Sequence, residues 1–516
     1  MIRLEGLDAG AERVFATDAL GHRFEAPVLF GEAELGPLPA ATYRVDLVGG
    51  GLTRGTDLTT VAAHAGAAPV PAFATSTGGD AEAVRVAAFA RRLRATFVQV
   101  YDWMASYSAP LPAADAYLDP LGRRLSRPAL TRLIALLAAE RTVAQAYAPV
   151  YGADPAVAAL EPELRLYGPD GTPEHLADLV AVMHPGLAAW IERWLGAWEP
   201  AHRLGFGGFH LDTYGYPHAA TDIGGKAVDM AVAFDRFLAA VRRAFPEDLL
   251  TFNQVNTHPA GLTLVPAPSA RYVEVWPPND GWRHLEGVLA RAGAGPDHAT
   301  VLAIYPTVWG SGRARPDALR TVCLTEAVVT SLGADLLVWG DDQGVLCDPY
   351  YPRHERLTDD EARTALVWHR FALSVRDLMR RGRDASWEDV GGVNRAVVVE
   401  ARSPVAPEPL GGGLYARVRR GHGWLALSLL DLTGSENGRW TEPSGPGRGG
   451  PVTVAVALPE PGRWRAEVAR VGVDDGRFSP VALRTVPHDE GSALAVDLDD
   501  LSGWAVVRLV TDGARW

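Results

Sequence analysis

The spacing of hydrophobic residues divides the chain into three sections. In the first, residues 1 to about 75, short runs of β-strand composition alternate with turns rich in glycine and proline. The predicted strands are Glu25–Gly31, Thr42–Val48 and Leu58–Ala63. We therefore expect a small N-terminal β-sandwich-like domain over residues 1–75. The segment Ala68-Pro-Val-Pro-Ala72 is typical of a linker to the next section.

In the second section, residues 80–385, short apolar strands alternate with helical stretches. The predicted strands are Phe97–Tyr101, Val143–Val150, Asp178–Met183, Phe206–Asp212, Leu249–Asn256, Tyr272–Trp276, Val301–Tyr305 and Leu336–Gly340. The helical stretches include Pro128–Arg141, Leu187–Trp198, Ala227–Phe245, Trp282–Ala292 and Ala318–Leu332. Eight such units over about 300 residues predict an α/β fold of the (β/α)8 TIM-barrel type. A doubly wound open sheet is the alternative, but no glycine-rich nucleotide-binding motif follows a strand.

In the third section, residues 390–516, short strands return with turns between them. They are Arg395–Arg402, Leu414–Arg419, Trp424–Leu432, Val452–Leu458, Trp464–Val471, Ala493–Leu498 and Ala505–Leu509. This spacing predicts a C-terminal β-sandwich domain, so the barrel would be flanked by β-domains on both sides.

Composition narrows the classes of partner. Apolar residues make up 47% of the chain and charged residues 22%, which is typical of a globular protein. The formal net charge of −13 argues against nucleic acid and against an anionic membrane surface as partners. A neutral oligo- or polysaccharide substrate is compatible with this charge. Moderate acidity also simply keeps a protein in solution.

Redox state and location are predicted from other features of the sequence. Two cysteines, Cys323 and Cys347, are too few for a disulfide framework, so we expect them to be reduced or buried. The first residues lack a basic stretch followed by an apolar one, and no apolar run reaches the ~18 residues of a membrane span. A cytoplasmic protein is the expectation.

Chemically capable residues gather at the ends of the predicted strands. In (β/α)8 enzymes the active site lies at the carboxyl ends of the strands, where the loops begin. The residues predicted there are Tyr101, Asp102, Trp103, His210, Asp212, Tyr214, Asn253, Asn256, Glu274, Trp276 and Asp341. Polar and aromatic side chains would thus converge on one rim, as a sugar ring with apolar faces and a hydroxyl edge requires.

Two of these residues, Asp212 and Glu274, could face each other across the barrel mouth. Cleavage of a glycosidic bond needs such a pair, one group to protonate the leaving oxygen and one to attack the anomeric carbon or activate water. Glu274 has the apolar neighbours Val273, Val275 and Trp276, which favours a raised pKa and the acid role. Asp212 has hydrogen-bonding neighbours and suits the ionised nucleophile. Either residue could instead cap a helix or pair with an arginine.

The other candidates also have two interpretations. Asp102 could bind a sugar hydroxyl with Trp103 beneath it, or brace the rim. His210 shares the face of Asp212 by strand alternation, so it could orient that carboxylate, bind a hydroxyl, or lie in the core. The asparagines could bind hydroxyls or cap loops, and Asp341 could line the rim or begin a helix.

No metal or other cofactor is expected. His184, His210 and His258 come after different strands without the tight spacing of a zinc site. A calcium loop of the Asp-x-Asp-x-Asp-Gly kind is also missing from the sequence.

Several motifs together resemble glycoside hydrolase family 66, the family of dextranases and cycloisomaltooligosaccharide glucanotransferases. They are Tyr101-Asp-Trp103, Ala146-Tyr-Ala-Pro-Val-Tyr-Gly-Ala153, Gly208-Phe-His-Leu-Asp-Thr-Tyr-Gly215, Phe252-Asn-Gln-Val-Asn256, Tyr272-Val-Glu-Val-Trp276 and Asp348-Pro-Tyr-Tyr-Pro352. The resemblance runs from about 95 to 380, with the motifs in the family's order. It implies a retaining mechanism on α-1,6-linked glucan, with the Asp after strand four, Asp212, as nucleophile and the Glu after strand six, Glu274, as acid/base.

The sequence departs from the family pattern in four places. Family members are largely secreted, whereas the first residues of this chain do not look like a signal peptide. The N-terminal β-section is short, and no carbohydrate-binding insert of ~100 residues interrupts the barrel, as one does in the cyclising enzymes. Gly340 is followed by Asp341-Asp342 where the resemblance leads one to expect a Glu.

The sequence thus predicts a retaining α-glucan hydrolase whose two carboxyl groups lie about 5–5.5 Å apart. A sugar hydroxyl in place of water would give transglycosylation. Two alternatives remain: a hydrolase or transglycosylase of short cytosolic α-glucosides, and a carbohydrate-binding protein without catalysis.

Overall fold

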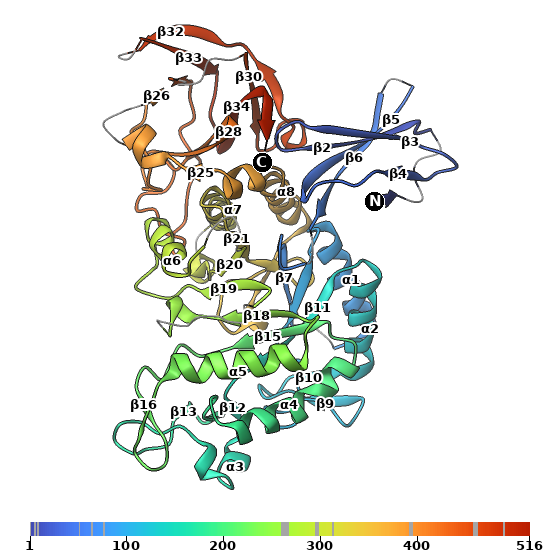
Figure 1. Cartoon of the computed structure of the whole chain (residues 1–516), viewed down its shortest axis with the longest axis vertical. Helices are drawn as coiled ribbons and strands as arrows, with labels where there is room; N and C mark the ends of the chain where they lie inside the picture. Colours follow the sequence, from blue (N-terminus) through green and yellow to red (C-terminus); the bar gives the residue numbers. More distant parts are fainter. Residues whose placement is uncertain are drawn as a thin grey trace.

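The molecule is built around one curled sheet, with the sheets of the N- and C-terminal residues at one end and small sheets toward the other (Figure 1). The computed structural model describes residues 2–4, 7, 10–50, 52–62, 65–75, 78–259, 268–294, 299–311, 314–391, 396–457, 463–488 and 491–515. Three residues at the ends of predicted strands, Ala63, Arg395 and Leu458, lie outside these ranges.

The central sheet has eleven strands, and its parallel part curls back on itself. The parallel strands are β7 (Pro71–Ala74), β8 (Phe97–Val100), β11 (Val143–Pro149), β15 (Gly208–Asp212), β18 (Leu249–Asn253), β19 (Ala270–Glu274), β20 (Thr300–Ala303), β21 (Asp335–Leu337) and β22 (Trp339–Gly340). Each pairs with the next along the chain from β7 to β21. Val338 alone separates β21 from β22, and β22 pairs with β7, so the ladder returns to its first strand. Antiparallel strands β23 (Gly344–Val345) and β24 (Glu355–Arg356) extend it.

Helices alternate with most of these strands. They are α1 (Asp80–Arg92), α2 (Arg127–Ala139), α4 (Ala188–Arg203), α5 (Met230–Ala244), α6 (Leu285–Arg291), α7 (Arg315–Ser331) and α8 (Asp359–Arg381). Side-chain caps fix several starts: Asp229 accepts from the N–H of Val232 at α5, and Thr358 and Glu361 form a capping box at α8. The cap at Asp229 explains why α5 begins later than the predicted Ala227.

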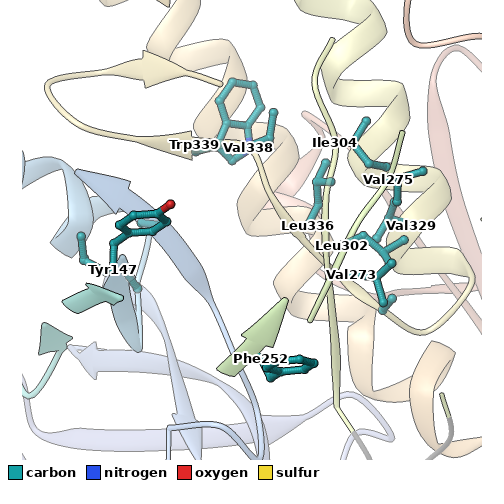
Figure 2. Packing of buried hydrophobic residues seen from close by; sticks show 14 of the residues in the cluster. Tyr147, Phe252, Val273, Val275, Leu302, Ile304, Val329, Leu336, Val338 and Trp339 are labelled. Carbon is teal, nitrogen blue, oxygen red and sulfur yellow. The ribbon is translucent and has the colours of Figure 1, made fainter. Parts of the chain in front are cut away.

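Strand alternation sorts side chains into two cores. Val273 of β19 and Val275 just after it join Leu302, Ile304 and Leu336 of the neighbouring segments in the layer against the helices, where Val329 of α7 meets them (Figure 2). Tyr272 lies on the other face of β19, in a smaller interior cluster with residues such as Phe73, Phe97 and Leu337. Glu274, two residues on, has the interior orientation of Tyr272. The periodicity of the strands therefore places the candidate chemistry inside the curl.

Two strand predictions were wrong. Asp178–Met183 was expected to be the third parallel strand, but β14 (Val180–Val182) pairs antiparallel with β12 (Gly152–Ala153) and β13 (His175–Leu176) in a separate small sheet. The first parallel strand is instead β7, within the stretch predicted as a linker and the end of the N-terminal section. Its four residues are all buried, and a proline at a strand's first residue does not disrupt its ladder. The two errors offset each other, so Asp212 still ends the fourth parallel strand and Glu274 the sixth.

The N-terminal residues form antiparallel sheets. β3 (Arg23–Pro27), β2 (Arg13–Asp18), β5 (Ala41–Gly49) and β6 (Leu52–Val61) stand in this order in one sheet, and β1 (Ile2–Leu4) pairs with β4 (Ala33–Leu35). The strand predicted at Glu25–Gly31 ends earlier, at Pro27, because the chain turns at Phe30 and Gly31, both with positive φ. Strand β2 was not predicted.

The C-terminal residues form two facing sheets. One has the order β25 (Arg383–Asp384), β28 (Leu414–Asp431), β34 (Trp504–Arg515), β30 (Trp464–Arg470) and β31 (Ser479–Val481), with β27 (Val405–Ala406) beside β28. The other has the order β26 (Val397–Ala401), β29 (Val452–Val456), β33 (Gly491–Leu498) and β32 (Arg484–His488). Apolar side chains from both sheets share one core. The strands predicted at Leu414–Arg419 and Trp424–Leu432 are one continuous strand, β28, despite the glycines between them.

Candidate active site

One amide nitrogen links the two predicted catalytic carboxylates. Asn253, the last residue of β18, donates through Nδ2 to Oδ1 of Asp212 at 2.7 Å and to Oε2 of Glu274 at 3.0 Å. The backbone N–H of Glu274 donates to Oδ1 of Asn253 at 3.2 Å, which fixes the amide orientation because an N–H can only donate. Two oxygens in hydrogen-bond contact with the same nitrogen lie less than about 6 Å apart.

Two tyrosines complete the hydrogen bonding of the carboxylates. The hydroxyl of Tyr147, on β11, donates to Oδ2 of Asp212 at 2.9 Å. The hydroxyl of Tyr305, just after β20, donates to Oε1 of Glu274. Each oxygen of the pair therefore accepts a hydrogen bond from a side chain of a neighbouring strand. Such fixed donors hold the carboxylates in place before any ligand arrives.

The electrostatics of the pair favour a shared proton. Burial, and then the charge of Glu274, raise the pKa of Asp212 to about 8, against the lowering effect of Asn253 and Tyr147. Burial also raises the pKa of Glu274, although Tyr305, Asn253 and the indole of Trp276 lower it. Two buried carboxylates this close resist simultaneous ionisation, so the pair keeps one proton at neutral pH.

The predicted physical basis for separating the two roles was wrong. Val273 and Val275, the apolar neighbours of Glu274 in sequence, point away from it into the outer layer. Asp212 is the more buried carboxylate, and Glu274 has as many donors. The surroundings of the two groups therefore do not single out Glu274 as the group that keeps the proton. The roles of the two carboxylates have to be assigned from their positions in the site instead.

A cavity of about 440 Å³ opens beside the pair. The small sheet of β12, β13 and β14 contributes part of its wall, with Leu176, Ala177, Leu179 and Val180. Aromatic and polar side chains form the rest of the wall. They include Tyr101, Asp102, Tyr107, Tyr147, Tyr214, His218, Asn256, His258, Trp276 and Tyr350. The mixture of apolar wall and convergent polar groups is typical of a small-molecule or sugar site.

Five predicted binding residues line this cavity. Tyr101 stacks on Tyr351 with 4.1 Å between ring centroids. Asp102 is buried, and burial, opposed by Arg123, raises its pKa to about 7. Tyr214, Asn256 and Trp276 lie around the same space. Trp276 remains 38% exposed where it lines the cavity.

Four predicted binding residues do not line the cavity, and two of them, Trp103 and Asp341, are structural. Trp103 is fully buried, and its indole donates to the carbonyl of Tyr147 at 3.2 Å, so it is a core residue rather than a platform. Asp341 is buried, accepts hydrogen bonds from the N–H and hydroxyl of Thr75, and braces the loop after β7. The cavity lining includes neither residue. Asn253 lies between the carboxylates instead of at the cavity wall.

His210 is the fourth of these residues, and it lies next to Asp212. Its Nδ1 lies 2.9 Å from the hydroxyl of Thr251, and its Nε2 is 4.0 Å from Oδ1 of Asp212, on the face that alternation predicts. Burial lowers its pKa to about 3, so the ring is neutral. A neutral ring close to Asp212 leaves that carboxylate free of an ion pair.

Sequence reasoning missed several residues of the site. Tyr147 and Tyr305 were within predicted strands, and Tyr305 was the last residue of its strand, where a strand-end survey could have found it. The residues 176–180 belong to the small sheet and its turn, whose approach to the cavity depends on long-range packing. Tyr350 belongs to the Asp348–Pro352 motif, but the sequence assigned it no place at the cavity.

The described part of the chain contains neither a metal-binding cluster nor a membrane-spanning helix. Within it, no three or more His, Cys, Asp or Glu side chains gather as a metal site would require. None of its helices has the length and apolar character needed to cross a membrane. Both cysteines are free, with Cys323 buried and Cys347 partly buried.

Comparisons with known proteins agree with this fold. The model of glycosyl hydrolase family 66 matches residues 67–507. A cycloisomaltooligosaccharide glucanotransferase of Niallia circulans is 25% identical over 263 residues, which cover 45% of this chain and 27% of that protein. The match thus spans about a quarter of the relative's length.

Solved structures show the same fold at low sequence identity. A cycloisomaltooligosaccharide glucanotransferase of Paenibacillus sp., solved with cycloisomaltoheptaose, has a TM-score of 0.79 at 15% identity and covers 98% of this chain and 95% of its own. An α-amylase of Geobacillus thermoleovorans, solved with acarbose, has a TM-score of 0.54 at 10% identity, with 87% and 100% covered.

The curled α/β sheet and the family match place the chain among the glycoside hydrolase families. More particularly, the chain belongs to glycosyl hydrolase family 66, as its motifs indicated.

Proposed function

We propose that this protein is a retaining glycoside hydrolase that cleaves α-1,6-glucosidic linkages in dextran or isomaltooligosaccharides, with Asp212 as nucleophile and Glu274 as general acid/base. The observation that carries the proposal is the contact of Asn253 Nδ2 with both carboxylates at 2.7 and 3.0 Å. It holds one oxygen of each carboxylate less than about 6 Å from the other, which is compatible with the ~5–5.5 Å of retaining enzymes and short of the ~6.5–9.5 Å that an inverting enzyme needs for its water.

The reaction would proceed in two displacements. An oxygen of Asp212 attacks the anomeric carbon while Glu274 gives its proton to the departing glycosidic oxygen, whose bond to carbon breaks. Glu274, now ionised, takes a proton from water, and the water oxygen displaces Asp212 from the sugar. A sugar hydroxyl in place of water transfers the glycosyl group instead. Both outcomes restore the starting protonation.

The shared proton suits this cycle. Each step begins with one carboxylate ionised and one protonated, which is the state that the raised pKa values of the buried pair favour. Positive charge that develops on the sugar in the transition state stabilises an ionised Asp212. We place the acid role on Glu274 because Trp276, two residues on, faces the cavity opening, where a leaving sugar has room.

The proposed scaffold is a (β/α)8 barrel over residues 80–385 with an N-terminal β-domain and a C-terminal β-sandwich over 390–516. The return of the strand ladder through β22 to β7 supports the closed barrel. The N-terminal β-domain would end before Pro71, because β7 joins the parallel strands.

The substrate is proposed to be an α-1,6-glucan because the Niallia circulans relative and the Paenibacillus structure are both cycloisomaltooligosaccharide glucanotransferases. A specific observation favours short members of that class. The cavity of about 440 Å³ is bounded by residues 176–180 and Tyr350, so it resembles a pocket more than a long groove. A hydrolase or transglycosylase of short α-glucosides is therefore the second candidate.

Product analysis tests the proposal. The enzyme should release α-anomeric sugar first from linear isomaltooligosaccharides, as proton NMR of the fresh product detects, and Asp212→Asn should abolish release. Initial β-anomer would overturn the retaining mechanism. Turnover of α-1,4-linked oligosaccharides in preference to α-1,6-linked ones would overturn the linkage. A wild-type protein that binds sugar without turnover would be a carbohydrate-binding protein.

A further inference from the structure

The loop that begins after Glu274 is held in place from two sides. On one side is Asn256, whose Oδ1 accepts from the backbone N–H of Trp276 at 2.9 Å and from Nδ2 of Asn279 at 3.0 Å. Its Nδ2 donates to the carbonyl of Pro277 at 3.3 Å. Asn256 has a φ of 51°, a left-handed conformation that Asn adopts more readily than most residues. The predicted sugar-binding role of Asn256 is thus accompanied by a bracing one.

On the other side is the C-terminal section. Arg439, between β28 and β29, pairs through Nη1 with Oδ2 of Asp280 at 3.0 Å. The neighbouring carbonyl of Gly438 accepts from the N–H of Trp282 at 2.9 Å, and Gly281 and Arg439 form a β-bridge. A segment about 160 residues away in sequence therefore fixes the far end of the loop that begins at Trp276.

This loop determines what surrounds Glu274. Trp276 lines the cavity, and its ring packs edge-on against Tyr305, with 6.1 Å between centroids. Tyr305 in turn donates to Glu274, and the indole of Trp276 also stabilises the ionised form of that carboxylate. A shift of the loop would move the ring of Trp276 within the cavity.

We infer that Trp276 forms the subsite for the sugar that leaves and for the acceptor that replaces it, and that Arg439 positions this subsite through Asp280. The inference rests on the proposed function. The acid/base protonates the leaving oxygen, so an exposed aromatic ring next to it contacts the leaving side of the bond, where a pyranose can lie on its face. The ligand class is a glucosyl unit. Arg439 touches neither substrate nor reacting atoms and is a positioning residue.

The Arg439–Asp280 pair is better suited to positioning the loop than to stabilising the fold. Both side chains are partly exposed, and exposed pairs contribute little to folding. Its loss should therefore change acceptor binding more than folding. Arg448 provides a matched control, since it lies in the same loop region with an exposed side chain.

The experiment compares Arg439→Gln with Arg448→Gln in three measurements on the full chain. The first is fluoride release from α-glucosyl fluoride, which needs no sugar in the leaving subsite. The second is the KM for isomaltotriose as acceptor, and the third is the Kd of isomaltotriose for Asp212→Asn carrying each change. Arg439→Gln should leave fluoride release near wild type and raise KM and Kd about five- to tenfold, whereas Arg448→Gln changes none of them. Arg439→Lys, which keeps a donor for Asp280, should recover part of the loss.

Each other outcome has a definite meaning. Equal acceptor KM and Kd in the two variants, with fluoride release intact, would overturn this inference and leave the proposed function standing. A parallel fall of fluoride release and acceptor binding in Arg439→Gln would assign it a general structural role and also overturn the inference. A wild-type enzyme that neither releases fluoride nor binds isomaltotriose would overturn the proposed function and the subsite with it.

Discussion

Replacement of Asn253 by leucine tests whether one amide organises both carboxylates. Leucine has nearly the same shape, so the change removes the donor to Asp212 and Glu274 without opening a large cavity. It also leaves the backbone N–H of Glu274 without its side-chain acceptor. The two carboxylates would then be held by Tyr147 and Tyr305 alone.

The expected loss is set by the energy of hydrogen bonds to charged groups. One such bond contributes about 1.5–3 kcal/mol, and the pair carries one negative charge at a time. A loss of one bond's worth in the transition state lowers kcat/KM by about 10- to 150-fold. Asn253 also lowers both pKa values, so its loss should raise them and move the acid limb of the kcat/KM profile to higher pH.

The assay is the pH dependence of kcat/KM on isomaltooligosaccharides, with unfolding midpoints to verify the fold. Asn253→Asp keeps the shape but adds a third carboxylate, so it should lose more activity than Asn253→Leu. A folded Asn253→Leu enzyme with kcat/KM within about threefold of wild type and an unmoved acid limb would refute the reasoning.

Three further predictions concern the protonation of two buried groups and the role of Asp341, one of the predicted binding residues that lie outside the cavity. Glu274→Gln removes a charge that raises the pKa of Asp212, so the acid limb of fluoride release from α-glucosyl fluoride should move to lower pH; an upward or absent shift would contradict the coupling. Burial opposes the charged form of His369, but Glu326, 2.6 Å away, outweighs burial and raises the pKa of His369. The protonated His369 therefore stabilises the fold fully below about pH 6.5, and this stabilisation is lost as the pH rises through the raised pKa. His369→Leu should cost about 3–5 kcal/mol at low pH and less above that window, measured by urea unfolding; a loss independent of pH would contradict this. Asp341→Asn should lower stability by about 1–3 kcal/mol with an unchanged KM, and a raised KM at unchanged stability would return Asp341 to the binding site.

Strand ends carried most of the predictable information. Asp212 and Glu274 are both the last residues of parallel strands, where the chain must present side chains to the mouth of the curl. Pro71–Ala74 escaped prediction because four residues with a proline have the composition of a linker, and only pairing with β8 and β22 makes them a strand.

Trp103 and Trp276 show why the rest could not be predicted. Both tryptophans come within two or three residues of a strand end, yet one is core and the other faces the cavity. Asp102 has a φ of 48°, which turns the chain so that Trp103 packs under Tyr147, whereas Asn256 and Arg439 hold the loop of Trp276 at the opening. The difference depends on contacts distant in sequence, which periodicity does not encode.

Covalent trapping tests the central claim most directly. A fluorinated α-glucosyl fluoride slows release of the glycosyl-enzyme, and mass spectrometry of the digested protein then locates the attached sugar. We expect one glycosyl group on the peptide that contains Asp212, formed in wild type and absent in Asp212→Asn. A sugar attached to any other residue, or turnover of unmodified substrate by Asp212→Asn at the wild-type rate, would contradict the account.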